Sequence, residues 1–209
     1  MTGASDPTWA SYRQEAFGDP YLVWHDGPDF AVFQQNWERD PELATRMLVA
    51  GIAEGDALAA ETVRELRLTP AQRSHFVATL LASSMLQHGG VRIAALRSLV
   101  ELTGDPSHAT GIAEELHIAA HWGDRLDAAL ALRDLAATPA LVTDLATAVA
   151  GDPEYLVRYH AANTLLHWAG LPAEIESHDD LFALLTADES PEKWARVAAD
   201  LAARVPATS

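Results

Sequence analysis

A pattern of residues that recurs every 33 positions is the feature of this sequence that most restricts its fold. Arginine and proline hold two positions of the pattern, at Arg92, Arg125, Arg158, Pro106, Pro139 and Pro172. Small and apolar side chains recur with the same period, in the triplets Ala95/Leu99/Leu102, Ala128/Leu132/Leu135 and Ala161/Leu165/Trp168. Because each triplet is spaced i, i+4 and i+7, it predicts one apolar face of a helix. A fixed period of this length predicts a stacked array of helical repeats.

The residues between these helices predict where each pair of helices begins. An aspartate or threonine before proline supplies an N-cap acceptor and a first-turn residue whose missing N–H costs nothing. This signal stands at Asp40-Pro41, Thr69-Pro70, Asp105-Pro106 and Thr138-Pro139, and a last pair follows Leu171-Pro172. Five pairs are therefore expected over residues 41–205, with an offset of 36 residues from the first pair to the second. Near the last pairs, Asp152 and Pro153 are expected to open a helix and Gly170 to end it.

Two segments of the array match the pattern of a known repeat family. Val91-Arg92-Ile93-Ala94-Ala95 and Val157-Arg158-Tyr159-His160-Ala161-Ala162 resemble the second helix of the HEAT repeat family, in the short HEAT-like form named after phycobilisome lyases. Gly123-Asp124-Arg125 departs from that pattern, because Asp124 stands where the family has valine. The resemblance implies an all-α fold, a right-handed α-solenoid of about five HEAT-like helical pairs. It also implies that the recurrent arginines pair with acids of adjacent repeats.

Residues 1–40 differ in composition from the array and predict an aromatic-rich N-terminal capping segment. They hold eight of the fifteen aromatic residues, at Trp9, Tyr12, Phe17, Tyr21, Trp24, Phe30, Phe33 and Trp37. An end repeat has one face without a neighbour, and large side chains can bury that face. A ligand pocket built by the same aromatic residues is the alternative that the sequence leaves open. At the other end, residues 206–209 are expected to form a short tail.

Composition and charge restrict the partners of the chain. Thirty acidic and fourteen basic residues give a formal net charge of −16, which repels phosphate backbones and anionic membrane surfaces. We therefore expect no nucleic acid and no membrane as partner, but a protein of basic charge, with the oligomeric state left open. The sequence has no cysteine, no signal-peptide pattern at its amino terminus and no apolar run of the ~18 residues that span a membrane. The expected location is the cytoplasm.

The repeat pattern also predicts a binding groove on the second helices of the pairs. With Ala95 and Leu99 facing the core, Arg97 and Glu101 point away from it. Together with the equivalent positions of the other repeats, the candidate groove residues are Glu61, Glu65, Arg97, Glu101, Leu130, Asp134, Tyr159, Asn163 and His167. Leu130 and Tyr159 are the expected anchors between the acidic positions, because charges at the rim of an interface contribute little affinity.

Glu114, His117 and His121 form the alternative site. Spacings of three and four would place their side chains along one side of a helix, where imidazoles could bind zinc or iron. The companion motifs of such sites are missing, since the sequence has no HExxH and no repeated His-Glu pair. The residues also lie beside an apolar seam of the same segment, which favours a structural role.

Motifs for catalysis are absent from the sequence, which has no GxSxG, no phosphate-binding glycine loop and no dinucleotide fingerprint. We therefore expect no catalytic residue and no cofactor. The hypothesis from the sequence is a non-catalytic protein-binding scaffold or inhibitor, a class that includes toxin-neutralising proteins, whose acidic concave groove binds a basic protein. A HEAT-like enzyme or metalloprotein that uses Glu114, His117 and His121 is the alternative.

Overall fold

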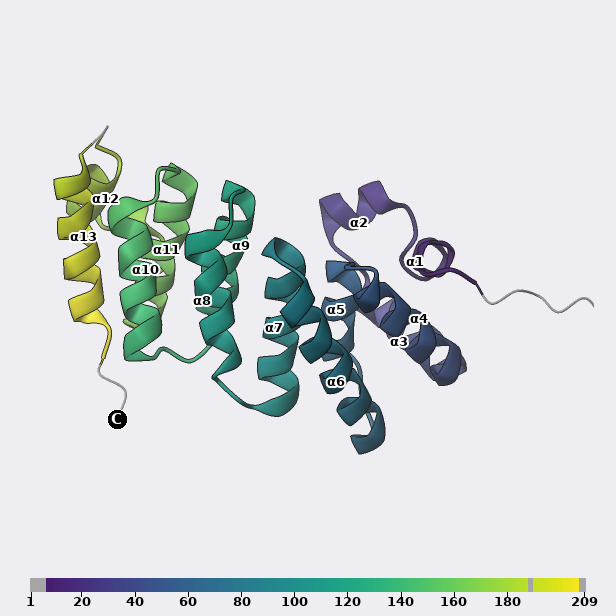
Figure 1. Ribbon diagram of the computed structural model, residues 1–209. Coiled ribbons are helices and arrows are strands. Elements are labelled where there is room, and N and C mark those ends of the chain that lie inside the picture. The colour runs from purple at the N-terminus through teal and green to yellow at the C-terminus, as the bar shows by residue number, and fades with distance from the viewer. Residues whose placement is uncertain (1–6, 188–189, 207–209) are drawn as a thin grey trace, which may run out of the picture.

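The computed structural model describes residues 7–187 and 190–206, and every regular element in these two ranges is a helix (Figure 1). The helices are α1 (Trp9–Phe17), α2 (Pro20–Asp26), α3 (Phe30–Arg39), α4 (Pro41–Ala53), α5 (Ala57–Arg64), α6 (Pro70–Leu86), α7 (Gly89–Thr103), α8 (His108–Ile118), α9 (Trp122–Arg133), α10 (Pro139–Gly151), α11 (Tyr155–Trp168), the 3-10 helix η1 (Ile175–Ser177), α12 (Asp179–Leu185) and α13 (Pro191–Arg204). The all-α prediction is confirmed for these residues. Of the predicted tail, residues 207–209 lie outside the described ranges.

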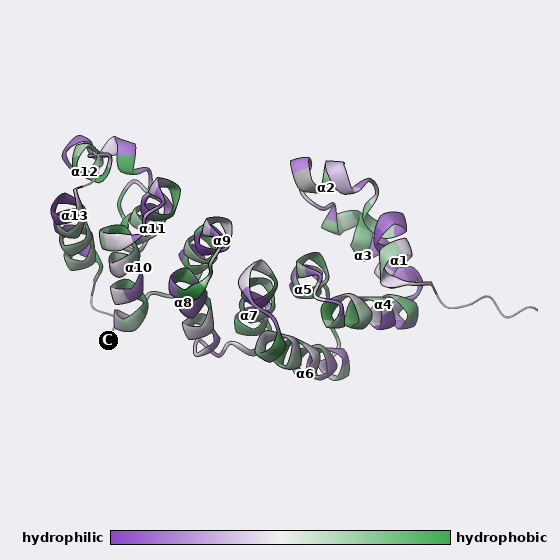
Figure 2. Ribbon diagram, turned by 45° about the horizontal axis from the view of Figure 1, so that its top comes forward, coloured by the Kyte–Doolittle hydropathy of each residue, from purple (hydrophilic) through white to green (hydrophobic). Residues whose placement is uncertain are grey.

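The helices from α4 to α11 alternate between two layers. Helices α4, α6, α8 and α10 are the first helices of successive pairs, and α5, α7, α9 and α11 are the second helices. Each second helix packs against the first helix of its own pair, and neighbouring second helices pack against each other. Figure 2 shows the second helices along one side of the molecule, between α2 at one end and α12 at the other. We call the side of α5, α7, α9 and α11 that is turned away from the first helices the second-helix face.

The short turns inside the pairs lie along one edge of the molecule, the upper edge in Figure 1. The turn after α4 meets the turn after α6, because the side-chain amide of Gln87 lies against Gly55. In the same way the Asp124 carboxylate, at the start of α9, accepts a hydrogen bond of 3.0 Å from the backbone N–H of Gly90 in α7. We call this edge, formed by residues 54–56, 85–90, 118–124 and 151–156, the turn edge.

The first two predicted seam positions are buried in all four second helices. The first seam position is fully buried in all four second helices, at Ala59, Ala95, Ala128 and Ala161. The next seam position, one turn later, is also fully buried, at Val63, Leu99, Leu132 and Leu165. Ala59 and Val63 of the first pair lie 36 residues before Ala95 and Leu99 of the second and are buried like them, in agreement with the 36-residue offset between these pairs. Alanine at the first position lets successive second helices approach closely, because it places only a methyl group between them.

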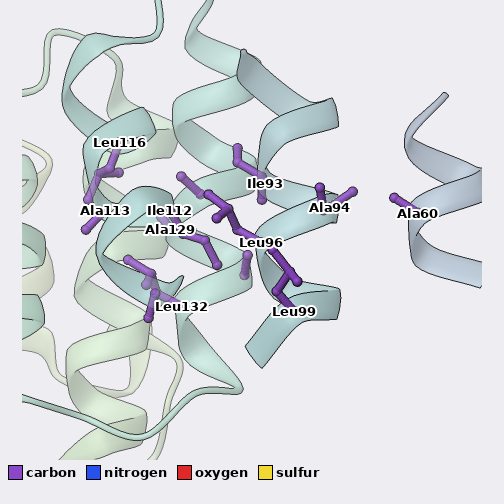
Figure 3. Close-up of a cluster of buried hydrophobic side chains, with 14 of the residues drawn as sticks. Ala60, Ile93, Ala94, Leu96, Leu99, Ile112, Ala113, Leu116, Ala129 and Leu132 are labelled. Carbon is purple, nitrogen blue, oxygen red and sulfur yellow. The ribbon is translucent and has the colours of Figure 1, made fainter. Parts of the chain in front are cut away.

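The core between α7, α8 and α9 shows how the two layers interlock (Figure 3). Ile93 and Leu96 of α7 are directed toward Ile112 of α8, whereas Ala94 on the other side of α7 is directed toward Ala60 of α5. A glycine permits the contact with α8, since a Cβ atom at Gly111 would lie 2.7 Å from the Leu96 Cδ1 atom. The apolar residues of α7 thus pack against helices on both of its sides, α8 on one and α5 on the other.

Side-chain hydroxyl groups add hydrogen bonds between successive second helices. The Ser98 hydroxyl donates to the Ala60 carbonyl at 2.8 Å, and the Thr164 hydroxyl donates to the Ala129 carbonyl at 2.9 Å. These two bonds join equivalent positions of the array. The third pair has Ala131 at the position of the hydroxyl group and therefore lacks this bond.

Four aromatic residues of the N-terminal segment pack as a cluster against α4. Trp9, Tyr12, Phe33 and Trp37 are buried, and α1 and α3 both contact α4. The Trp9 indole N–H donates to the Asp56 carboxylate at 2.8 Å. A Cβ atom at Gly51 would lie 2.5 Å from the Trp9 ring, so glycine is required there for α1 to dock.

The last predicted pair does not follow the others. Helix α13 packs against α10 in the layer of first helices, because its apolar stripe of Val197, Ala198 and Leu201 is buried there. The chain before it returns along α11, where the backbone N–H of Ile175 donates to the Asn163 side chain at 2.9 Å. The prediction that the second helix of every pair lines the binding surface is therefore wrong for this pair.

Two helices also begin later than the sequence predicts. Helix α11 begins at Tyr155 and not at Pro153, because the Asp152 carboxylate binds Arg125 and the N–H of Glu154. Helix α8 begins at His108, after a turn in which Asp105 accepts a hydrogen bond from the N–H of Ser107. The Asp-Pro signals at these two places therefore mark turns that precede the helices.

Ala161→Leu tests the close approach of α9 and α11. The larger side chain has no space at a fully buried contact, so we expect a loss of about 1 to 3 kcal/mol in the free energy of unfolding. Urea denaturation of the variant and of the wild type measures the difference. Ala136→Leu, at an exposed position after α9, is the control and should change the stability by less than about 0.5 kcal/mol. Equal stability of the two variants would contradict the assigned register.

Candidate functional site

Ion pairs occupy the centre of the second-helix face. Arg97 of α7 pairs with Asp134, which follows the last residue of α9. It also lies near Glu101, with 3.8 Å between Arg97 Nε and Glu101 Oε1. Glu65 pairs with Arg64 at 3.1 Å. The structure therefore brings Arg97, Glu101 and Asp134 together as an ion-pair group. However, three of the predicted acids already have a cation of the protein beside them, so this part of the face is less acidic than the sequence indicates.

Glu61 differs from these acids, because no described residue forms a hydrogen bond or ion pair with its carboxylate. The side chain is half-buried on α5, and burial raises its pKa above the ordinary value of 4.5, against the opposing effect of Arg64 and Arg97. Asp127 of α9 was not among the predicted groove residues, and its pKa is also raised, first by burial and then by Asp124. The face therefore holds two carboxylates whose charge is poorly compensated.

Asp127 of α9 lies beside the start of α7. A Cβ atom at Gly90 would lie 3.8 Å from the Asp127 carboxylate, at ordinary van der Waals distance.

The structure removes one predicted residue from the binding surface at α11. Asn163 is only 5% exposed and accepts the backbone hydrogen bond of Ile175, so its assignment to the open groove is wrong. Tyr159 donates its hydroxyl to Glu176 at 2.6 Å, a bond that raises the pKa of Tyr159 and lowers that of Glu176. The returning segment thus lies along this part of the face, and His167 at the far end of α11 stays exposed.

Leu130 remains an accessible apolar side chain on the second-helix face, with 38% of its surface exposed. Near the other predicted anchor, burial and then Arg133 lower the pKa of His160, which keeps this imidazole neutral at pH 7. Of the two predicted anchors, Leu130 is therefore the better placed to meet a partner, because the hydroxyl of Tyr159 is already bound within the chain.

The alternative site at Glu114, His117 and His121 is not assembled on one helix. Helix α8 ends before His121, which is the N-cap residue of α9. Glu114 pairs with Arg92 at 2.7 Å, and His117 Nε2 lies 3.3 Å from an Asp144 oxygen. The premise that the three side chains line one helix is therefore wrong. Within the described residues, no group of three or more histidines and acids is placed to hold a metal ion.

Two of the recurrent arginines bind acids of the following repeat, as the family pattern implies. Arg92 donates to Glu115 of α8 at 2.9 Å, and Arg125 makes two hydrogen bonds to Asp152, at 2.7 and 3.1 Å. Both carboxylates are buried, and the Glu115 carboxylate also accepts the N–H of Gly89 at the start of α7. These ion pairs join successive repeats.

Arg158 departs from this pattern. No acid among the described residues pairs with it, and its guanidinium lies 3.8 Å from the centre of a Trp194 ring. It donates to the backbone carbonyls of Asp152 and Pro153, at 2.7 and 3.0 Å, and burial lowers its pKa. The expected ion pair is therefore replaced by a cation–π contact at the last repeat.

Exposed apolar side chains gather on the turn edge, which the sequence analysis did not single out. They are Met85, 83% exposed, with Leu86 (77%), Ile118 (63%), Leu156 (43%) and Trp122 (39%). Met85 and Ile118 lie in the last turns of successive first helices and are 33 residues apart. The sequence signal was present, because a solvated turn that follows an amphipathic helix is ordinarily polar.

Comparison with known proteins does not assign the chain to a family. No protein-family model, curated protein or solved structure matches the sequence or the fold. None of the helices in the described ranges combines the length and the apolar character that crossing a membrane requires. The chemistry of the second-helix face and of the turn edge is therefore the basis for assigning a function.

Arg125→Met tests the ion pairs between repeats. The substitution leaves the Asp152 carboxylate, 6% exposed, buried without its cation, and we expect a loss of about 3 kcal/mol in the free energy of unfolding. The double variant Arg125→Met/Asp152→Asn should regain part of this loss, because it removes the uncompensated charge. Arg204→Met breaks an exposed pair with Asp200 and should cost less than about 1 kcal/mol. A loss no larger than that of the control would refute the structural role.

Glu61→Gln tests the cost of the unpaired carboxylate. A carboxyl group whose pKa is raised in the folded protein destabilises the fold at every pH at which it is ionised there, and the penalty disappears as the pH falls through the raised pKa toward 4.5. The variant should therefore melt at a higher temperature than the wild type at pH 7. This difference should shrink in acid. Glu101→Gln, an exposed acid of the same face, is the control and should not show this pH-dependent gain.

Proposed function

We propose that the chain is a non-catalytic scaffold of HEAT-like repeats that binds a basic protein, and that the turn edge supplies the apolar anchors of the interface. The observation that carries the proposal is the row of exposed apolar side chains along three successive pairs. The acidic groove expected from the sequence becomes a secondary part of the surface, because most of its acids are paired or lie under the returning segment.

The repeat architecture supports the scaffold part of the proposal. Helices alternate between two layers, the seam alanines recur at one buried position, and arginine–acid pairs join the repeats. These features fit a right-handed HEAT-like α-solenoid, in which each repeat contacts chiefly its neighbours and presents an extended surface.

The apolar side chains of the turn edge have a large energy to gain from a partner. Removing a side chain of this size from water contributes about 1.5 to 3 kcal/mol when burial is complete. Met85 and Ile118 are well over half exposed, and no described part of the chain covers them. Methionine can adapt its shape to a partner, and tryptophan, present at Trp122, is a frequent hot-spot residue.

Acidic side chains beside this row favour a basic partner. Asp127 and Glu154 are exposed on or next to the turn edge. The net charge of −16 attracts a basic protein over a longer range and raises its association rate at low ionic strength. Charge therefore favours association with a basic protein, whereas burial of the exposed apolar side chains supplies most of the binding free energy.

The unpaired carboxylates of the second-helix face support the same assignment. A lysine or arginine of the partner near Glu61 or Asp127 would offset the cost of their partial burial. The pKa of each carboxylate would then fall on binding, so the complex should weaken as the pH falls through the raised pKa of the free protein.

An affinity purification from the source organism with three baits tests the proposal. The baits are the wild type, the edge variant Met85→Ser/Ile118→Ser, and the control Ala195→Ser/Ala199→Ser on the exposed side of α13. We expect a basic protein that is retained by the wild type and the control and lost by the edge variant. With the purified partner, the edge variant should raise Kd by about tenfold or more, equivalent to about 1.4 kcal/mol.

The charge of the partner and the dependence of its association rate on salt show whether the proposal fails. The association rate should fall between low and physiological ionic strength, because the attraction between exposed charges is screened. An acidic partner, or a Kd that the edge variant leaves unchanged, would refute the proposal. An association rate that does not respond to salt would refute its electrostatic part.

A further inference from the structure

We infer that the N-terminal segment also forms a binding pocket for a small aromatic carboxylate, separate from the protein-binding surface. A pocket of ≈ 560 Å³ lies between α1, α2 and the turn that joins α4 to α5. Its volume falls within the range of about 300 to 1,000 Å³ that is typical of small-molecule sites. Its chemistry combines aromatic and aliphatic walls with one arginine.

One face of α1 forms a wall of the pocket. Ala10, Arg13, Gln14 and Phe17 line it at the spacing of successive helical turns, while Trp9 supplies part of the floor. The other face of the helix holds Tyr12 and Ala16, which are buried in the aromatic cluster. The segment thus uses one face of α1 to cover the array and the other to line the pocket.

The position of α1 is set by contacts that do not need a ligand. Trp9 donates to Asp56 and packs against Gly51, and the Phe17 ring stacks on Phe33 with centroids 4.7 Å apart and planes 13° apart. Phe17 is only half-buried and also faces the pocket. The aromatic walls are therefore formed before a ligand enters, which reduces the entropy cost of binding.

Arg13 is the group that recognises an anion. Its Nε atom lies 3.2 Å from Asp56 but is buried without a well-aligned hydrogen bond, and no hydrogen bond from a described residue engages its terminal nitrogens. The Asp56 carboxylate is already committed, because it accepts the indole N–H of Trp9 and the backbone N–H of Leu58. The guanidinium therefore keeps donors that suit the planar geometry of a ligand carboxylate.

Other polar residues of the lining restrict the charge of the ligand. Glu54 and Asp56 both line the pocket beside its one arginine, so the site disfavours ligands with several negative charges, such as phosphate esters. Gln14 offers an amide that can donate or accept a hydrogen bond. A ligand with one carboxylate and an apolar ring matches this set, with the ring between Phe17 and Val23 and the carboxylate at Arg13.

Isothermal titration of the full chain with 2-naphthoate and with 2-naphthamide tests the inference. The two probes have the same ring system and differ in charge. We expect one site for 2-naphthoate and binding of 2-naphthamide that is weaker by about tenfold, since a charge-assisted hydrogen bond is roughly twice as strong as a neutral one. Arg13→Gln should remove this preference, and Glu54→Gln should tighten the binding of 2-naphthoate.

Filling the pocket tests the location of the site without removing Arg13. Ala10→Trp and Val23→Trp, each verified as folded by circular dichroism, should abolish the binding of 2-naphthoate. The turn-edge variant Met85→Ser/Ile118→Ser should bind the probe as the wild type does, so the test is independent of the proposed protein-binding function. Absence of binding at millimolar probe, equal binding of the two probes, or binding that both filling variants retain would overturn the inference.

Discussion

The close approach of successive second helices is the constraint on which the rest of this structure depends. Alanine at the seam positions of α5, α7, α9 and α11 keeps only a methyl group between neighbouring helices. The hydroxyl bonds of Ser98 and Thr164 and the ion pair of Arg125 span the same interval, with lengths of 2.7 to 2.9 Å for their shortest contacts. These side chains have a fixed length, so they can form such bonds in several repeats only when the distance between neighbouring helices is the same. The alanines keep that distance constant.

This packing separates the acids of the chain into two groups with different roles. Glu115 and Asp152 are buried where repeats meet, and the arginines that bind them hold the repeats together. Glu61 and Asp127 gain no such partner, and burial raises the pKa of each. An acid that costs stability without joining helices is better explained by what it binds than by what it supports.

Local periodicity made much of this fold predictable from the sequence. The seam residues and the bounds of α4 follow from apolar spacing and from an N-cap before proline, which both act within a few residues. The position of α13 depends on contacts with residues far away in the sequence. Its apolar stripe fits against either layer of helices, and in the structure α10 buries it. Asn163 and Asp152 were misassigned for a related reason: the sequence does not specify whether a polar side chain serves its own helix or a segment packed against it.

The ends of the array show why aromatic residues outside the repeats are needed. At the amino end, Trp9 and Arg13 of the N-terminal segment both contact the carboxylate of Asp56. At the carboxyl end, Arg158 has no following acid, and Trp194 covers its guanidinium. An aromatic ring stabilises a cation through its quadrupole without adding a charge that needs its own partner. At Asp56 and at Arg158, an indole ring therefore contacts a polar group to which the arginine–acid pairs of α7 and α9 do not extend.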